Sequence, residues 1–161
     1  MIGIKPTAKC TKTLLYRYPG TYDYRLFDVK SGKYLGKINM DKREKELYIK
    51  WLKICDGEQR KGYGTFLLDF AKKMSEQMGF NGRLELLASI LPGSLNTPPH
   101  IFYRKYGFTS NNRKMLSKID RCIKNNKQLT SEDPQIHMYY EPKKSKSNII
   151  TLFGNFIKRV S

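Results

Sequence analysis

The first half of the chain has the pattern of a β-sheet. Short segments rich in β-branched, aromatic and aliphatic residues are separated by turn-forming residues, with a hairpin connection at residues 30–33. They predict strands at residues 13–18, 22–29, 34–40 and 46–55. In the last of these, apolar residues occupy neighbouring as well as alternate positions, which predicts a strand buried on much of both faces.

After residue 61 the spacing of the apolar residues changes from that of a strand to that of a helix. From residue 62 to 78, apolar side chains recur at helical spacing, and Gly79 is a typical stop. The remaining pattern predicts, in order, a strand at 83–89, a short helix at 101–106, a helix at 112–127, a strand at 136–141 and an amphipathic helix at 149–160. Strands and helices in this order predict a mixed α/β fold.

The length of 161 residues fits one domain. We place that domain at residues 1–142 and treat 143–161 as a basic linker followed by the amphipathic terminal helix. No run reaches the length of a membrane span, and no secretory signal is expected at the start. Three widely spaced cysteines argue against a disulfide framework and for a reducing, cytoplasmic setting, and the cysteines and histidines lack metal-ligand spacing.

Charge is the outlier of the composition. Lys and Arg number 31 against 14 Asp and Glu, a formal net charge of +17. Such a charge favours anionic partners, namely nucleic acid, acidic lipid or a polyanionic cofactor. It is spread along the whole chain, so a generally basic composition explains it equally well.

The segment 55–65 has the chemistry of an anion-binding loop. Gly57, Gly62 and Gly64 let the backbone turn tightly and approach a ligand, and free amides at the start of the next helix attract an anion. A nucleotide P-loop is excluded because Tyr63-Gly64 stands where Lys-Ser/Thr is needed. A dinucleotide fingerprint is excluded because position 67 is leucine.

What remains is Gln59-x-x-Gly62-x-Gly64, with Ile54 five residues before the glutamine. Downstream come Asn96, Tyr103 after seven residues, and then Gly107-Phe108. These motifs, in this order across residues 46–108, resemble the GCN5-related N-acetyltransferase (GNAT) superfamily.

The resemblance implies a central mixed β-sheet, splayed between its fourth and fifth strands and flanked by helices. It implies acetyl-CoA as cofactor, with its pyrophosphate on the glycine loop and its pantetheine arm along the fourth strand. The cofactor-binding residues carried over are Leu52, Ile54, Gln59, Arg60, Lys61, Gly62, Tyr63, Gly64, Thr65, Asn96 and Tyr103. Many relatives wall the acceptor site with two helices before the second strand, which the pattern here lacks, so we expect a more open site.

Two residues are candidates for proton transfer. Tyr103 is the expected acid for the departing thiolate, with a packing aromatic as the alternative. Glu85 is the candidate base, although it equally fits a solvent-facing position on an alternating strand, and water could carry the proton instead. His100 is expected to be structural or exposed.

These residues predict an acetyl-CoA-dependent N-acetyltransferase acting on a small-molecule or peptide amine. The charge keeps two alternatives open: a basic nucleic-acid-binding module on the same fold, and an enzyme that acetylates aminoacyl-tRNA, as a toxin or translation regulator. RNA is the less favoured partner, and a homodimer is compatible with the sequence. The basic helix at 112–127 is the first candidate for acceptor selection, or simply a packed surface helix.

Overall fold

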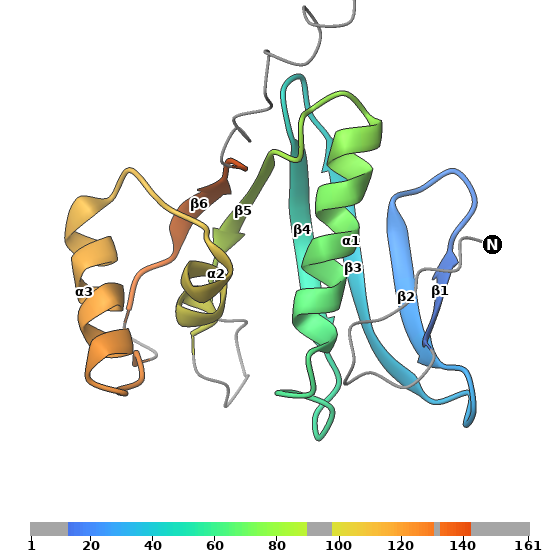
Figure 1. The fold of residues 1–161 in the computed structure, drawn as a ribbon, viewed down its shortest axis with the longest axis horizontal. Coiled ribbons are helices and arrows are strands. Elements are labelled where there is room, and N and C mark those ends of the chain that lie inside the picture. The colour runs from blue at the N-terminus through green and yellow to red at the C-terminus, as the bar shows by residue number, and fades with distance from the viewer. Residues whose placement is uncertain (1–12, 90–97, 131–132, 143–161) are drawn as a thin grey trace, which may run out of the picture.

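The computed structural model describes residues 13–89, 98–130 and 133–142. They form one mixed sheet in the order β1-β2-β3-β4-β5-β6, together with helices α1 to α3 (Figure 1). The elements are β1 (Thr13–Arg17), β2 (Asp23–Asp28), β3 (Tyr34–Lys42), β4 (Leu47–Ile54), α1 (Tyr63–Gln77), β5 (Leu84–Ala88), α2 (His100–Tyr106), α3 (Arg113–Lys124) and β6 (Ile136–Tyr140). Every element predicted between residues 13 and 141 is therefore present.

Strands β1 to β4 form an antiparallel meander. The connection from β1 to β2 is a tight turn, closed by a hydrogen bond from the Tyr18 amide to the Asp23 carbonyl at 3.1 Å. The described residues between β1 and β2 therefore leave no room for a helix.

Strands β4 and β5 run parallel and pair only over residues 47–49 and 84–86. Beyond this point β4 continues to Ile54 while β5 turns away toward β6 (Figure 1). The crossover helix α1 joins the two strands. The sheet is thus splayed at the position that the resemblance implied.

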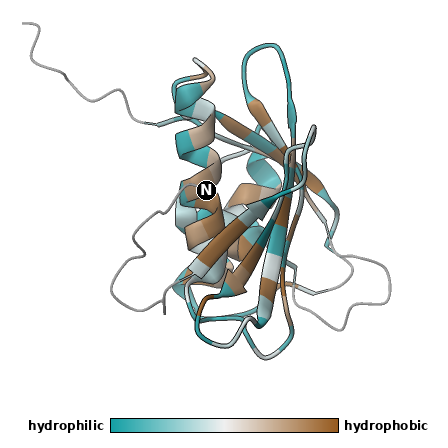
Figure 2. Cartoon of the chain, turned by 90° about the vertical axis from the view of Figure 1, so that its right-hand side faces the viewer, coloured by the Kyte–Doolittle hydropathy of each residue, from teal (hydrophilic) through white to brown (hydrophobic). Residues whose placement is uncertain are grey.

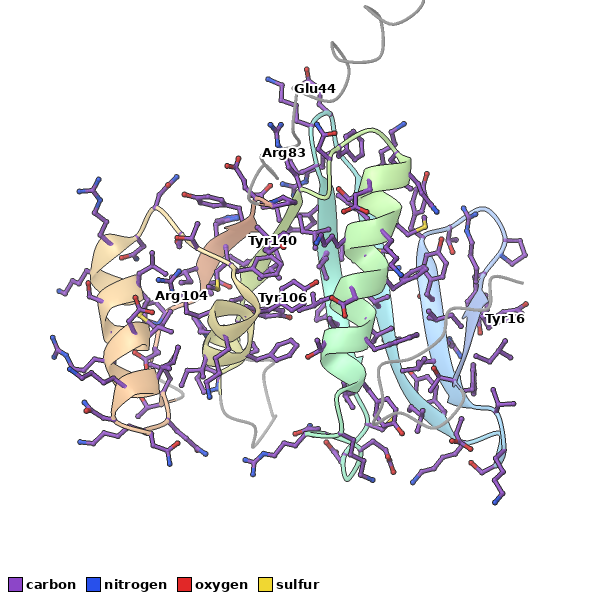
Figure 3. All side chains as sticks on the ribbon, in the orientation of Figure 1. Tyr16, Glu44, Arg83, Arg104, Tyr106 and Tyr140 are labelled. Carbon is purple, nitrogen blue, oxygen red and sulfur yellow. The ribbon has the colours of Figure 1, made fainter. Side chains whose placement is uncertain are left out.

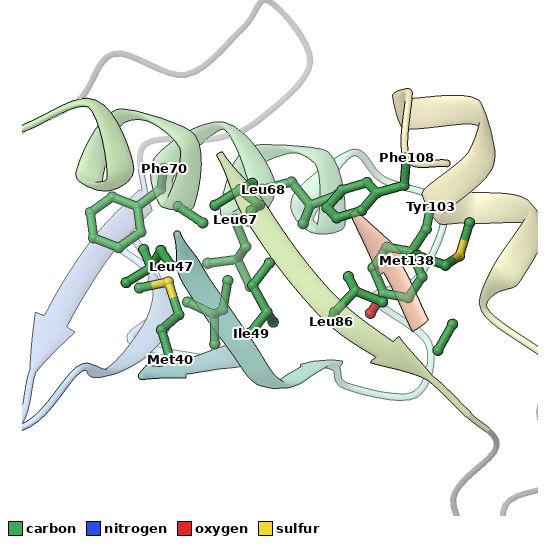
Figure 4. Packing of buried hydrophobic residues seen from close by; sticks show 14 of the residues in the cluster. Met40, Leu47, Ile49, Leu67, Leu68, Phe70, Leu86, Tyr103, Phe108 and Met138 are labelled. Carbon is green, nitrogen blue, oxygen red and sulfur yellow. The ribbon is translucent and has the colours of Figure 1, made fainter. Parts of the chain in front are cut away.

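The helices lie on one side of the sheet (Figure 2). The apolar face of α1 packs on it with Phe66, Leu67 and Phe70, over β4 and β5 residues such as Leu47 and Leu86 (Figure 4). The predicted burial of residues 46–55 on both faces is wrong, because Trp51 is 50% exposed. No described helix covers the second face, so the aliphatic positions of β4 are buried on the α1 side only.

Helix α2 is short, and polar contacts to its neighbours hold it. Arg104 forms a bidentate ion pair with Asp120 of α3, at 2.7 and 3.0 Å. The Tyr106 hydroxyl donates to Asp69 of α1 at 2.8 Å, so α2 is tied on both sides (Figure 3). His100 is fully buried, with Nε2 3.1 Å from the Pro134 carbonyl. This confirms its structural role.

Some expectations fall outside the described residues, including Asn96 and the amphipathic helix at 149–160. Across 13–89, 98–130 and 133–142, no helix has the length and apolarity to cross a membrane. In the same ranges there is no cluster of His, Cys, Asp and Glu suited to a metal ion.

His100 makes stability depend on pH. Burial lowers its pKa, and its Nδ1 is buried without a partner among the described residues. The unfolded chain binds a proton below pH about 6.5, whereas the folded chain resists it. We therefore expect the free energy of unfolding to fall as the pH is lowered from 7 to 5, and to fall less in His100→Gln.

The matched control is His137→Gln, because the His137 side chain is 66% exposed. Urea unfolding of the three proteins at several pH values measures the effect. A decline of equal slope in wild type and His100→Gln would show that another group carries the pH dependence.

Candidate active site

The gap between β4 and β5 leaves one edge of β4 without a strand partner. Residues 51–54 still pair with β3, so the backbone groups that point away from β3 face the gap. The register shifts where Asn39 pairs with Trp51 and Met40 with Ile49, so Lys50 is an extra, bulged residue. A bulge bends its strand and interrupts pairing, which is why β4 leaves β5 here. The free edge can bind an extended ligand as a further strand would.

The loop after β4 ends in a helix N-terminus that is open to an anion. Gly62 precedes α1 with φ 89°, a left-handed conformation that glycine adopts without strain, and Arg60 has φ 62°. No side chain caps α1, and its first turn holds no acidic residue. The amides of Tyr63, Gly64 and Thr65 are therefore unpaired within the helix, and the helix dipole adds to their attraction for negative charge.

A buried carboxylate anchors this loop. Glu58 is 7% exposed and accepts hydrogen bonds from Lys33 at 2.7 Å and Lys61 at 2.9 Å. The hydrogen bond from Lys33, together with that from Lys61, lowers the pKa of Glu58. From the sequence, Lys61 was predicted to bind the cofactor, and no role was predicted for Glu58. Its spacing of three residues from Lys61 was a weak local signal, and Lys33 comes from the distant β2–β3 hairpin.

Gly64 has a packing role as well. A Cβ at this position would lie 2.9 Å from Cζ of Phe102, a residue of α2. The absence of a side chain lets α2 pack directly against the first turn of α1. The anion-binding amides and the helix that carries Tyr103 are thereby held next to each other.

Tyr103 lies at the vertex of the splay. Its ring packs on Phe108, with ring centroids 5.6 Å apart, and its hydroxyl points toward Leu86 (Figure 4). Leu86 is the last β5 residue paired with β4. Tyr103 is 7% exposed, and burial raises its pKa well above the usual range of a phenol. The side chain packs in the core and also directs a neutral hydroxyl toward the point where the strands separate.

Glu85 lies on the other face of the sheet. In β5 the side chains of Leu84, Leu86 and Ala88 are buried, whereas Glu85 is intermediate. Its carboxylate accepts from Arg43 at 2.9 Å and lies 3.5 Å from Nδ1 of His137. The side chains of Glu85 and Tyr103 therefore lie on opposite faces of the sheet, although both are near the point where β4 and β5 separate.

The other predicted cofactor residues surround the loop and the free edge. Leu52 and Ile54 pack against the core with their side chains, which leaves their backbone at the gap. Tyr63 is buried, and Gln59, Arg60 and Thr65 are exposed.

Comparison with known proteins rests on the fold. No protein-family model matches the chain, and no curated protein sequence matches it. Among solved structures, nourseothricin acetyltransferase is similar with a TM-score of 0.50 at 17% identity, over 73% of this chain and 62% of that one. A GNAT-family acetyltransferase from Staphylococcus aureus has a TM-score of 0.50 at 15% identity, over 75% and 67%.

The PaiA N-acetyltransferase from Thermoplasma acidophilum, solved in complex with coenzyme A, also has a TM-score of 0.50, at 16% identity over 74% of this chain and 59% of that one. The chain thus spans roughly 59–67% of the length of these three proteins. Together with the splay between β4 and β5, this likeness shows that the chain has the fold of the GCN5-related N-acetyltransferase superfamily.

Proposed function

We propose that this protein is an N-acetyltransferase that transfers an acetyl group from acetyl-CoA to an amine. The observation that carries the proposal is a continuous set of groups along one gap. The uncapped N-terminus of α1, the free edge of β4 and the hydroxyl of Tyr103 follow one another from the open end of the splay to its vertex. Coenzyme A bound to the Thermoplasma acidophilum neighbour supports the choice of cofactor.

The residues present fit acetyl-CoA. Its pyrophosphate requires several hydrogen-bond donors, which the amides of residues 63–65 provide, and the first turn of α1 holds no acidic residue. The one buried carboxylate of the loop, Glu58, is already paired with Lys33 and Lys61. Its pantetheine arm contains amide groups, which the unpaired backbone of residues 50–54 can bind in the manner of a strand. When bound, the cofactor supplies an activated thioester, and the protein's own groups position it and move the protons.

Tyr103 is proposed to provide the proton for the departing sulfur. A neutral amine nitrogen would form a bond to the carbonyl carbon as the carbon–sulfur bond breaks. The departing sulfur would gain a proton from the Tyr103 hydroxyl, and the proton that the nitrogen gives up on becoming an amide would return to Tyr103 through water. Because burial raises the pKa of Tyr103, the phenol remains protonated at neutral pH and is available as a donor. A backbone amide at the free edge of β4 can stabilise negative charge on the carbonyl oxygen.

The acceptor amine is proposed to approach from the sheet face opposite the helices. On the described residues this face is uncovered, and Glu85 lies on it one residue before the vertex residue Leu86. An amine that arrives protonated must lose its proton before it attacks. Glu85 is the carboxylate nearest the vertex in sequence and is proposed as the proton acceptor, directly or through water.

Substitution of Thr65 tests the site of the pyrophosphate. In Thr65→Glu, a carboxylate in the first turn of α1 favours the helix dipole but repels a bound anion. Opposite or like charges about 4 Å apart near a protein surface interact by about 4 kcal/mol. We expect unchanged or raised stability without ligand and at least about tenfold weaker binding of coenzyme A, measured by calorimetry.

Thr65→Gln is the matched neutral control and should bind coenzyme A like the wild type. Gly64 is a poorer probe because its substitution also displaces Phe102. Equal affinity of the Glu and Gln variants would place the pyrophosphate away from α1.

Tyr103→Phe tests the proposed acid. The buried ring is retained, so coenzyme A affinity should stay the same, while turnover should fall by about 100-fold, as expected for a lost general acid. Thiol release with a panel of primary amines measures turnover. Tyr106→Phe is the control, because its hydroxyl is bound to Asp69 and should affect stability rather than turnover. Full turnover in Tyr103→Phe, with chemistry rate-limiting, would leave Tyr103 only a packing role.

Glu85→Gln tests the proposed base. We expect a fall in kcat/KM of about 100-fold at neutral pH, because the amide cannot take a proton. Arg43→Gln is the control for the ion pair, since it removes the Arg43 contact but keeps the carboxylate. If Glu85→Gln retains the wild-type kcat/KM, the proton leaves without this side chain.

A further inference from the structure

The sheet face opposite the helices carries large apolar side chains that are unusually exposed. Of the exposed large hydrophobic residues, Tyr16 and Trp51 are each 50% exposed, and Leu14, Tyr18 and Tyr34 are between 37% and 40% exposed. The register places Leu14 beside Phe27 and Phe27 beside Tyr34 on this face. No described helix lies over it (Figure 2). We call this surface, formed by the outward side chains of β1 to β4, the open face.

A row of cations crosses the same face. Tyr16 pairs with Arg25, Arg25 with Lys37, and Lys37 with Lys53, so three positive side chains stand side by side on neighbouring strands. None of these cations forms an ion pair within 13–89, 98–130 and 133–142. Like charges directly opposite one another destabilise a sheet. Such a row is therefore costly unless an anion binds it.

Aromatic side chains flank the row of cations. The Arg25 guanidinium lies over the Tyr18 ring, 4.6 Å from its centroid, and its Nε is buried without a partner among the described residues. Trp51 follows in the next row, opposite Asn39, and Tyr16 stands at the β1 end of the cation row. The open face thus presents Tyr16 at the β1 end of the cation row and Trp51 in the neighbouring row, which also carries Asn39 and Asp23.

This chemistry discriminates between occupants. A second copy of the chain carries the same net charge of +17, and residues 143–161 contain five basic and no acidic residues, so both repel the cation row. A duplex presents phosphates but hides the flat faces of its bases. A single strand offers phosphates for the cations and unstacked bases for the rings, the combination used by sheet surfaces that bind single strands.

We propose that the open face binds single-stranded nucleic acid, with bases stacked on Trp51 and Tyr16 and phosphates on Arg25, Lys37 and Lys53. This site differs from the basic helix predicted at 112–127, which the sequence made the first candidate for acceptor selection. One of its cations, Lys118, is already paired with Asp133. The proposal does not depend on acetyl transfer, and its test uses no cofactor.

The single tryptophan of the chain provides a direct measurement. We expect twelve-nucleotide RNA oligomers to quench Trp51 fluorescence, because a stacked base contacts the indole. Affinity should fall with salt: the logarithm of the association constant should decrease with the logarithm of the salt concentration with a slope of about −2, for three phosphates at about 0.7 each. A DNA oligomer of the same sequence distinguishes RNA-specific binding from binding of any single strand. Either result with a quench supports the proposal.

Variants locate the binding. Lys37→Glu combined with Lys53→Glu should abolish most of the affinity and of the salt dependence. The matched control, Lys114→Glu with Lys124→Glu on α3, changes the net charge equally and should retain most of the affinity. With a fluorescently labelled oligomer, Trp51→Ala should weaken binding by about tenfold, and Trp51→Phe should restore it.

Three outcomes would overturn the proposal. The first is absence of binding at low salt with the folded full chain. The second is equal loss in the face and α3 variants, which would indicate unspecific attraction to the overall charge. The third is equal quenching by a duplex or by polyglutamate, which would identify a polyanion or an acidic polypeptide as the partner.

Discussion

The whole site depends on how briefly β4 and β5 pair. Three residue pairs join two halves of the sheet, and beyond them β4 has no neighbour on one side. An unpaired backbone edge next to a core is costly if water or a ligand cannot reach it. The bulge at Lys50 turns β4 away and keeps that edge accessible. Opening the sheet at one point therefore creates both the binding edge and the vertex at which Tyr103 is placed.

The gap must not close, and α1 and α2 prevent it. Phe102 packs on Gly64, and the hydrogen bond from Tyr106 to Asp69 adds a polar contact between the same two helices. On the other side, Arg104 binds Asp120 and so links α2 to α3. A helix this short has little stability of its own, so its position is set by these contacts. Tyr103 is kept in place by these contacts together, so the loss of the Tyr106 hydrogen bond alone lowers stability while the packing of Phe102 on Gly64 and the Arg104–Asp120 pair remain.

Much of this could be predicted from the sequence, and the limits have physical causes. Periodicity located the strands and helices because each buries one face, and the glycines around Gly62 marked a loop that needs positive φ. The hydrogen bond from Lys33 to Glu58 could not be predicted from local sequence, because it joins residues 25 positions apart. The prediction that β4 is buried on much of both faces was also wrong. Trp51 is an apolar residue, and its exposure depends on the missing cover of the sheet, which no local pattern records.

No described helix covers the open face, and a row of positive charges of the sheet lies on this same face. A sheet with one exposed aromatic face is prone to self-association, because two copies can bury their apolar patches against each other. Here the row formed by Arg25, Lys37 and Lys53 crosses that face, so two copies brought face to face would set six cations against each other. The positive charges that disfavour pairing of the open faces of two copies also favour the binding of an anion. Its aromatic rings then favour an anion that also carries planar rings able to stack on them, as the bases of a single strand do.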